Sequence, residues 1–317
     1  MRFTHPVNTL KKLGCGLAFG ATAIMAMPTS ALACTQIYMG SKLTADGNTY
    51  YGRSEDFGPR YVKHFGIEPA HKDGNEYTSV ESGFEYKSKG ATYRYTFVRD
   101  NPSQWEDRYD AYSEAGINEK GVSIAVLTLD SEPTKQDTGK PVLATTMAIR
   151  LVLDRAATTA EAVELLSKYD MFASSGRDYH FYITDASGDG RVLEYDCNDP
   201  ARPLTVTPSR SVTNFFVMYK DNVLPNQRNG VYGHGRERYD AIEEILDANA
   251  GSIDREIAWQ ALQAASQAPN PQDVTSNTQW SILYDNTALT AEAVIRRDWN
   301  TKTSYDLVSN VAVTDVG

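Results

Sequence analysis

Cysteine is scarce in this chain of 317 residues, which contains only three. Cys15 lies in an amino-terminal segment that we expect to be removed, which leaves Cys34 and Cys197. A disulfide framework therefore cannot hold the protein together. One bridge between Cys34 and Cys197 stays open as an alternative.

Positive charge is also in short supply, because 31 Lys and Arg face 41 Asp and Glu and give a formal net charge of −10. Contacts with phosphate groups require clustered Lys and Arg, so this balance argues against a nucleic-acid or anionic-membrane surface. The five histidines show no metal-ligand spacing. We expect neither a metal ion nor a cofactor.

Long apolar runs are absent except near the amino terminus. Arg2, Lys11 and Lys12 supply positive charge there, and residues 13–27 are apolar or small throughout. This order is typical of a signal peptide. The run is shorter than the about 20 apolar residues that a membrane-spanning helix needs, so we expect no stable membrane insertion.

The cleavage site of this signal peptide is indicated by small residues. Ala31 and Ala33 form the A-x-A pattern that signal peptidase accepts directly before Cys34. We therefore predict a cleaved signal peptide over residues 1–33, a partner role for signal peptidase, and a mature domain over residues 34–317. The protein would be periplasmic or secreted.

The mature chain has the composition of one globular domain, with 41% hydrophobic and 10% aromatic residues. β-branched and aromatic runs at residues 34–40 and 49–56 flank an Asp46-Gly47-Asn48 turn, which predicts a hairpin at the mature amino terminus. Further strands are expected within residues 90–99, 110–129, 179–195, 279–285 and 291–297, and helices at 142–156, 158–169, 236–249 and 254–266. Thr158 and Glu161 form a capping-box pair. Strand groups that alternate with helix pairs indicate an α+β fold with two sheets and helices outside them.

An amino-terminal cysteine would combine a nucleophile and a base in one residue. The thiol has a pKa of about 8.5, and the α-amino group has a pKa of about 7.7 to 8.0, so the amine can accept the thiol proton near neutral pH. Cleavage is required first, because a peptide nitrogen has no basic lone pair. The rival is a lipoprotein with Cys34 acylated, but Ala31 and Leu32 stand in the reverse of the usual lipobox order, which favours the catalytic interpretation.

Several segments in order resemble the cysteine-type N-terminal nucleophile hydrolases, which include choloylglycine hydrolases, penicillin V acylases and related acyltransferases, and the neighbouring N-terminal-cysteine dipeptidases. The segments are "CTQIYMGSKLTADGNTYYGRSEDF", "GINEKGVSIAVL", "HFYITDASGDGRVLEYD", "SVTNFF", "GRERYDAI" and "TQWSILYD". The resemblance covers most of the mature chain. It implies a four-layer αββα sandwich with two antiparallel sheets.

The resemblance also implies roles in the first hairpin. Cys34 would be the nucleophile and, through its amine, the base. Asp56 would orient that amine, and Arg53 would lie beside the thiol. Residues three apart on one strand point to opposite faces, so we expect a bend or the end of the strand near Phe57 and Gly58 if both line the site. The alternative for Arg53 and Asp56 is an ordinary ion pair at a strand end.

Three later positions complete the implied site. Asn214 corresponds to the family's oxyanion-hole asparagine, and Arg236 to the arginine that completes the site, although Arg238 is close by. Choloylglycine hydrolases usually have an asparagine where this chain has Thr128, so Thr128 is a candidate for contact with the oxyanion or the substrate. A Cys34–His180 dyad is conceivable but unnecessary once the amine is available.

The sequence thus favours an exported cysteine amidohydrolase that cleaves a linear, non-peptide C–N amide through a thioester. Its partner would be a small-molecule amide such as an N-acyl amino acid, a bile-salt amide or a penicillin-V-like amide; a homo-oligomer is compatible with the sequence. One alternative is an N-terminal-cysteine dipeptidase. Another is a lipidated, non-catalytic protein that binds an amide ligand.

Overall fold

The computed structural model of the protein describes residues 33–57, 63–74, 76–78, 85–87, 90–100, 113–173, 176–228, 230–273, 276–307 and 314–316. Residues 1–32 of the predicted signal peptide lie outside the described residues, so the cleavage position stays a prediction. In the described part of the chain, no helix is long and apolar enough to span a membrane.

Six antiparallel strands form the sheet that carries the amino-terminal hairpin. Their order is β14 (Ser211–Val212), β1 (Ala33–Met39), β2 (Tyr50–Asp56), β15 (Thr278–Asp285), β16 (Thr290–Ile295) and β17 (Thr303–Asp306). β1 and β2 pair with Cys34 opposite Glu55 and Ala33 opposite Asp56. The predicted hairpin is confirmed.

Eight antiparallel strands form the second large sheet. Their order is β13 (Leu204–Pro208), β12 (Gly190–Tyr195), β11 (Asp178–Thr184), β8 (Ser123–Leu129), β7 (Ala115–Asn118), β6 (Tyr95–Asp100), β3 (Lys63–Glu68) and β18 (Thr314–Val316). Two small sheets pair β9 (Val142–Ala144) with β10 (Asp170–Phe172) and β4 (Glu76–Thr78) with β5 (Glu85–Lys87).

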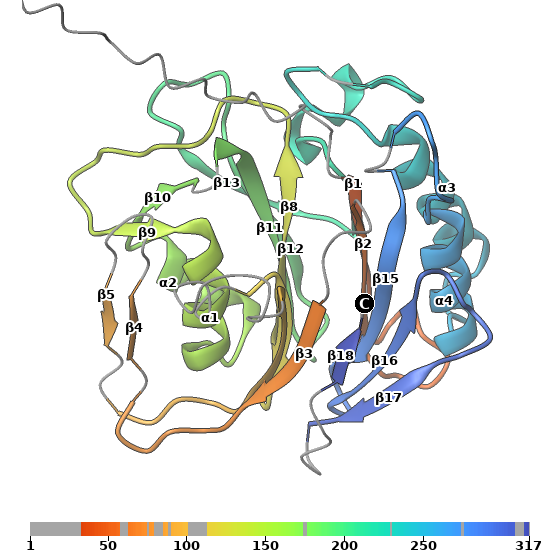
Figure 1. The fold of residues 1–317 in the computed structure, drawn as a ribbon, viewed down its shortest axis with the longest axis horizontal. Helices are drawn as coiled ribbons and strands as arrows, with labels where there is room; N and C mark the ends of the chain where they lie inside the picture. The colour runs from red at the N-terminus through yellow and green to blue at the C-terminus, as the bar shows by residue number, and fades with distance from the viewer. Residues whose placement is uncertain are drawn as a thin grey trace, which may run out of the picture.

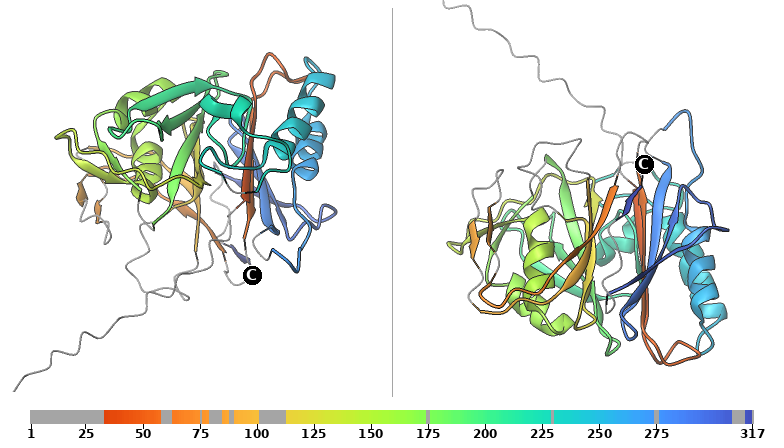
Figure 2. Two further views of the ribbon diagram at one scale, coloured as in Figure 1. Left: turned by 90° about the horizontal axis from the view of Figure 1, so that it is seen from above. Right: turned by 60° about the horizontal axis from the view of Figure 1, so that its bottom comes forward.

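Helices cover the outer faces of both large sheets, as Figure 1 shows. α1 (Thr145–Arg155) and α2 (Thr159–Leu166) pack on the eight-stranded sheet, and α3 (Arg236–Ala248) and α4 (Arg255–Ala264) pack on the six-stranded sheet. A short 3-10 helix, η4 (Val217–Asn222), precedes α3. The two views of Figure 2 show the same sequence of layers from above and from below. The αββα sandwich expected from the sequence is confirmed.

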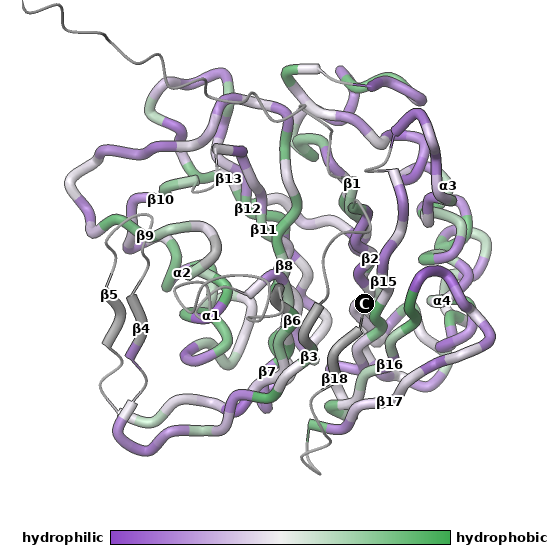
Figure 3. The backbone as a smooth tube through the Cα atoms, viewed as in Figure 1, coloured by the Kyte–Doolittle hydropathy of each residue, from purple (hydrophilic) through white to green (hydrophobic). Residues whose placement is uncertain are grey.

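Apolar side chains fill the three spaces between these layers. Every residue of β1 and β2 is buried, because one face meets the other sheet and the opposite face meets α3 and α4. Gly52 permits the close approach of α4: a Cβ atom there would lie 2.8 Å from Ile37 Cγ1 and 3.0 Å from Leu262 Cδ1. Figure 3 shows the hydrophobic stretches in the strands and helices and mostly hydrophilic connecting segments around them.

The expected elements are largely present, with two differences. Residues 142–144 form the strand β9 instead of the start of a helix, because α1 begins only at Thr145. Eight strands of two to six residues were not expected: β3, β4, β5, β10, β13, β14, β17 and β18. Those of two or three residues carry too few positions for the alternating pattern that identifies a strand in a sequence.

Candidate active site

Cys34 lies at the start of β1 with 5% of its surface exposed. Two side chains hold its main chain. The Cys34 N–H donates to Asn214 Oδ1 at 2.6 Å, and Arg238 Nη1 donates to the Cys34 carbonyl oxygen at 2.6 Å. Arg238 Nη2 also donates to Asn214 Oδ1 at 2.9 Å. The two side chains therefore form one hydrogen-bonded clamp around the backbone of Cys34.

Asn214 links this clamp to the opposite sheet. Its Nδ2 donates to the main-chain oxygen of Thr128 at 2.9 Å and lies 3.4 Å from Thr128 Oγ1. The structure thus brings Thr128 to the site. The shorter contact is made by the main-chain carbonyl oxygen of Thr128, which is an acceptor and cannot donate a hydrogen bond to an oxyanion. A substrate oxygen could replace the longer contact with the hydroxyl group.

Arg53 extends from β2 into the space between the sheets. Its guanidinium group donates to the main-chain oxygens of Glu114 at 2.8 Å and Val126 at 2.7 Å, and lies 5.3 Å from the ring centre of Trp280. Arg53 Nη2 also pairs with Glu55 Oε2 at 3.0 Å. The ordinary ion pair considered for Arg53 and Asp56 is thus replaced by a buried pair with Glu55.

Glu55 is a site residue that the sequence reasoning missed. It lies directly opposite Cys34 in the hairpin and is 5% exposed. The signal was present, because residues two apart on a strand share a face and Arg53 was already assigned to the site. Glu55 places a negative charge beside the thiol.

The thiol of Cys34 is held in its neutral form by this environment. Burial raises its pKa to about 12, and the charges of Glu55 and Asp56 act in the same direction. The positive charge of Arg53 and a hydrogen bond from the backbone N–H of Asp56 oppose the shift. Because burial dominates, proton removal from this thiol requires a nearby base.

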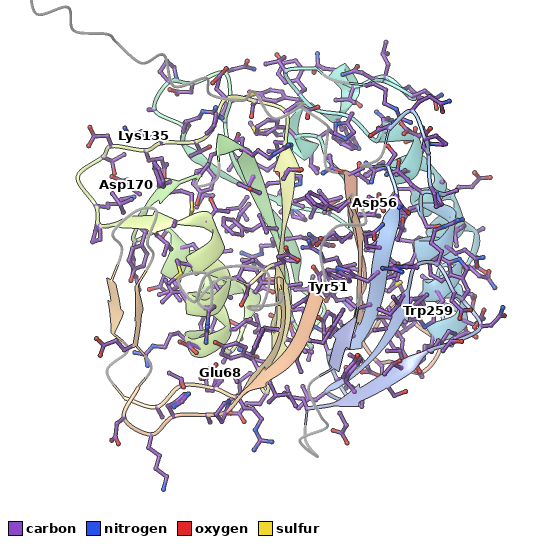
Figure 4. The ribbon with its side chains drawn as sticks, in the orientation of Figure 1. Tyr51, Asp56, Glu68, Lys135, Asp170 and Trp259 are labelled. Atoms are coloured by element: carbon purple, nitrogen blue, oxygen red, sulfur yellow. The ribbon has the colours of Figure 1, made fainter. Side chains whose placement is uncertain are left out.

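Asp56 ends β2 and is fully buried. The hydroxyl group of Thr278 donates to Oδ1, and the amide of Gln267 donates to Oδ2. Burial raises the pKa of Asp56 to about 6, although the positive charge of Arg238 opposes the shift. Figure 4 shows Asp56 near the end of its strand, with Tyr51 deeper between the sheets.

Arg53 and Asp56 approach Cys34 from opposite faces of β2. Arg53 bonds to the eight-stranded sheet, whereas Asp56 bonds to residues that follow α4. The alternation expected for residues three apart is therefore present, and β2 ends at Asp56, as the strand-end alternative predicts. Both residues act electrostatically on the thiol.

The expectation for Arg236 is wrong, and Arg238 occupies the place assigned to it. Arg236 begins α3, where it pairs with Asp240 at 2.7 Å and donates to the main-chain oxygen of Lys220. Arg238 is 5% exposed and reaches Cys34. Positions two apart on a helix point in nearly opposite directions, about 200° around the axis, so only one of the two can face the site.

The other cysteine and the histidine considered for a dyad have different surroundings. Cys34 and Cys197 are both free thiols, so the alternative disulfide is not formed. His180 Nδ1 lies 3.2 Å from Glu194 Oε1, and Glu194 accepts from the backbone N–H groups of Val217 and Met218. Within the described ranges, no group of three or more His, Cys, Asp or Glu residues is arranged to hold a metal ion.

Comparison with known proteins gives sequence relatives of one kind. The model of Peptidase family C69 matches residues 33–178. "Probable dipeptidase B" of Streptococcus pyogenes serotype M1 is 32% identical over 165 residues, which are 50% of this chain and 32% of the relative. "Probable dipeptidase" of Salmonella dublin is 32% identical over 96 residues, which are 30% of this chain and 21% of the relative. The matches therefore span about a third or less of these relatives.

Solved structures extend the similarity over nearly the whole chain. A mutant of the conjugated bile acid hydrolase from Clostridium perfringens has a TM-score of 0.69 at 16% identity and covers 90% of this chain and 96% of its own. Penicillin V acylase from Agrobacterium tumefaciens has a TM-score of 0.64 at 18% identity, with 89% and 90% covered. At these identities the likeness concerns the fold.

Proposed function

We propose that this chain, which has the αββα fold of the N-terminal nucleophile hydrolases and matches Peptidase family C69 in its amino-terminal part, hydrolyses a linear, non-peptide amide with Cys34 as nucleophile. One observation carries the proposal: Asn214 and Arg238 clamp the main chain of a buried cysteine beside Arg53. A cysteine with only a packing role would not need a buried guanidinium group and a buried amide on its backbone atoms.

Removal of residues 1–33 would convert the nitrogen of Cys34 into a free amine. Asn214 Oδ1 already accepts from this nitrogen at 2.6 Å, so it can orient the amine in the same way. The amine takes the thiol proton as the sulfur attacks the amide carbon, which matches the high pKa of the thiol. Asp56 would supply the negative charge that stabilises the resulting ammonium group.

The reaction then proceeds through a covalent intermediate. The new C–S bond gives a tetrahedral oxyanion, which the amide N–H of Asn214 can stabilise. The α-ammonium group returns its proton to the leaving nitrogen, the C–N bond breaks, and a thioester remains. Water attacks the thioester with the amine again as base, and the acid product leaves as the thiol is restored.

Export and maturation by signal peptidase are parts of the same proposal. The intact mass of the protein isolated from the exported fraction of its host tests them. A mass equal to residues 34–317 supports the free amine and thiol. A mass that includes diacylglycerol and a fatty acyl group contradicts the mechanism and makes Cys34 an anchor.

Substitution of Cys34 by Ser tests the catalytic proposal, with Cys197→Ser as the matched control. Both proteins would be assayed on bile-salt amides, phenoxyacyl amides, N-acyl amino acids and dipeptides. We expect Cys34→Ser to lose turnover by at least about a hundredfold, because the thiolate is lost, while Cys197→Ser retains it. Equal turnover by Cys34→Ser and the wild type would rule out Cys34 as the nucleophile.

Dipeptide hydrolysis is a second candidate, favoured by the match to Peptidase family C69 and to probable dipeptidases. Glu55 adds a negative charge beside Cys34, which suits the ammonium group of a dipeptide. The same substrate panel separates the two candidates. A kcat/KM that is higher for dipeptides than for every acyl amide would favour the dipeptidase over the amidohydrolase. Binding without turnover would support the non-catalytic alternative.

A further inference from the structure

A buried histidine–carboxylate pair lies next to the clamp around Cys34. His234 is 2% exposed, and its Nδ1 lies 2.8 Å from Asp130 Oδ2. We infer that His234 and Asp130 are positioning residues for Asn214 in the hydrolysis proposed above, on which this inference rests.

The loop that carries His234 is built directly against Asn214. The backbone N–H of His234 donates to the Asn214 carbonyl oxygen at 2.9 Å. Gly233 has a φ of +101°, and a Cβ atom there would lie 2.1 Å from the same oxygen. Only glycine permits this approach, so movement of His234 is transmitted to the backbone of Asn214.

The same loop also contacts the second member of the clamp. Gly235 has a φ of +90°, and a Cβ atom there would lie 2.2 Å from Arg238 Nη2. The hydroxyl group of Thr213 donates to the Gly235 carbonyl oxygen at 2.9 Å. Residues 233–235 therefore lie against the backbone of Asn214 and the guanidinium group of Arg238, the two residues that hold the backbone of Cys34.

Two parallel contacts join this region to the end of β8. Asn214 bonds to Thr128 within β8, and His234 bonds to Asp130, the residue after its last position Leu129. Figure 1 shows the end of β8 and the segment leading into α3 at the same side of the sandwich as the start of β1. The His234–Asp130 contact thus lies close to the Asn214–Thr128 contact. It helps to fix the spacing between the two sheets at the place where the Asn214 side chain bridges them.

The second nitrogen of the imidazole ring distinguishes this pair from a simple surface ion pair. Nε2 of His234 is buried and has no hydrogen-bond partner among the described residues. Buried polar atoms without a partner are uncommon and require an explanation. The imidazole is present despite this cost, which fits a structural role for its rigid ring in holding the backbone beside Asn214 at a fixed distance from Asp130.

Three variants and a matched control test the inference through kinetics. His234→Leu removes the contact and Asp130→Asn replaces its charged acceptor by a neutral amide, whereas His234→Asn keeps an N–H donor near the position of Nδ1. His71→Leu is the control, because His71 forms a pair of similar length with Glu68, at 2.7 Å, on the surface. We expect His234→Leu and Asp130→Asn to lower kcat roughly 10- to 100-fold through misplacement of Asn214, with KM changed less than about twofold.

Further expectations separate positioning from general destabilisation. His234→Asn should recover most of the lost kcat, and the double variant His234→Leu/Asp130→Asn should be no worse than either single variant. An unchanged kcat, no recovery in His234→Asn, or additive losses would each overturn the inference. Asp130→Asn changes no volume, so it keeps the test informative where His234→Leu fails to fold.

A readout without substrate separates this inference from the proposed function. The side-chain amide of Asn214 would be observed by ¹⁵N NMR and assigned by its loss in Asn214→Asp. We expect its signals to shift in His234→Leu and Asp130→Asn and to stay in place in His71→Leu. Absence of turnover in the wild type would reject the proposed function alone, whereas an unmoved Asn214 signal would reject the positioning role.

Discussion

Charge around Cys34 is distributed unequally over the two faces of β2. Arg53 and Glu55 share the inner face of β2 opposite Cys34 and neutralise each other at 3.0 Å. Asp56 lies on the outer face near Arg238. The thiol therefore meets little net positive charge, and its burial keeps it protonated until a base is in place.

Removal of the charge at Glu55 should make Cys34 more reactive. Glu55 raises the pKa of the thiol, and Glu55→Gln also leaves Arg53 without its counter-charge. In a Cys197→Ser background, we expect faster alkylation by iodoacetamide across pH 7 to 10, about tenfold for each unit by which the pKa falls. Glu164→Gln on the exposed surface of α2 is the control. A slower or unchanged rate for Glu55→Gln would contradict this account of the thiol.

The buried Asp56 should make stability depend on pH in the chain that retains Ala33. Burial raises its pKa from 3.8 to about 6, so between these values the folded chain holds a proton that the unfolded chain releases. The free energy of unfolding should fall by roughly 3 kcal/mol as pH rises from about 3 to 7, relative to Asp56→Asn. Urea unfolding at several pH values measures the difference.

A chain that begins at Cys34 provides the comparison. Its α-ammonium group would favour the ionised form of Asp56 and lower the pKa of that carboxyl group. The loss of stability between about pH 3 and 7 should then be smaller. Identical pH profiles for the two chains would place the amine away from Asp56.

The resemblance pointed to most residues of the candidate site, whereas the residues that depend on three-dimensional packing were missed. Cys34, Arg53, Asp56 and Asn214 are brought together as expected. Arg236 and Arg238 could not be separated, because the phase of a helix relative to its neighbours depends on packing. The pair of His234 and Asp130 joins residues 104 positions apart, which no local pattern reveals.

Helix α2 shows how local signals define an element. Thr158 accepts from the backbone N–H of Glu161 at 3.1 Å, and the Glu161 carboxylate accepts from the N–H of Ala157 at 2.8 Å. The predicted pairing of Thr158 and Glu161 is thus confirmed, although the carboxylate bonds one residue before the cap. Side chains within one turn suffice for such a contact, so the sequence alone could predict it.

Loss of this cap should affect stability without affecting chemistry. Thr158→Ala leaves an N–H group of the first turn without its partner, and we expect about 1 kcal/mol lower stability. Thr158→Ser keeps the hydroxyl group and should lose little. Thermal or urea unfolding measures the change, and an equal loss in both variants would show that the methyl group matters instead of the cap.

At the scale of the whole molecule, strand order lies beyond the sequence. The six-stranded sheet joins β2 to β15, more than 220 positions apart, and β1 to the two-residue strand β14. Neither pairing follows from composition or periodicity, because both depend on the way two distant segments pack. The resemblance supplied the four layers as a whole, and only the hairpins between neighbouring strands could be read from turn residues.

The register of the first hairpin also determines which residue would carry the new α-amino group after cleavage at each position. Ala33 occupies the place opposite Asp56, one step of about 3.4 Å along the strand from Cys34. A cut one residue early would leave the new amine one step from the thiol, on a different residue, with the peptide nitrogen of Cys34 still blocked. If the proposed mechanism holds, cleavage one residue too early would therefore leave a folded protein without activity, because the pairing of β1 with β2 fixes which residue carries the amine beside the thiol.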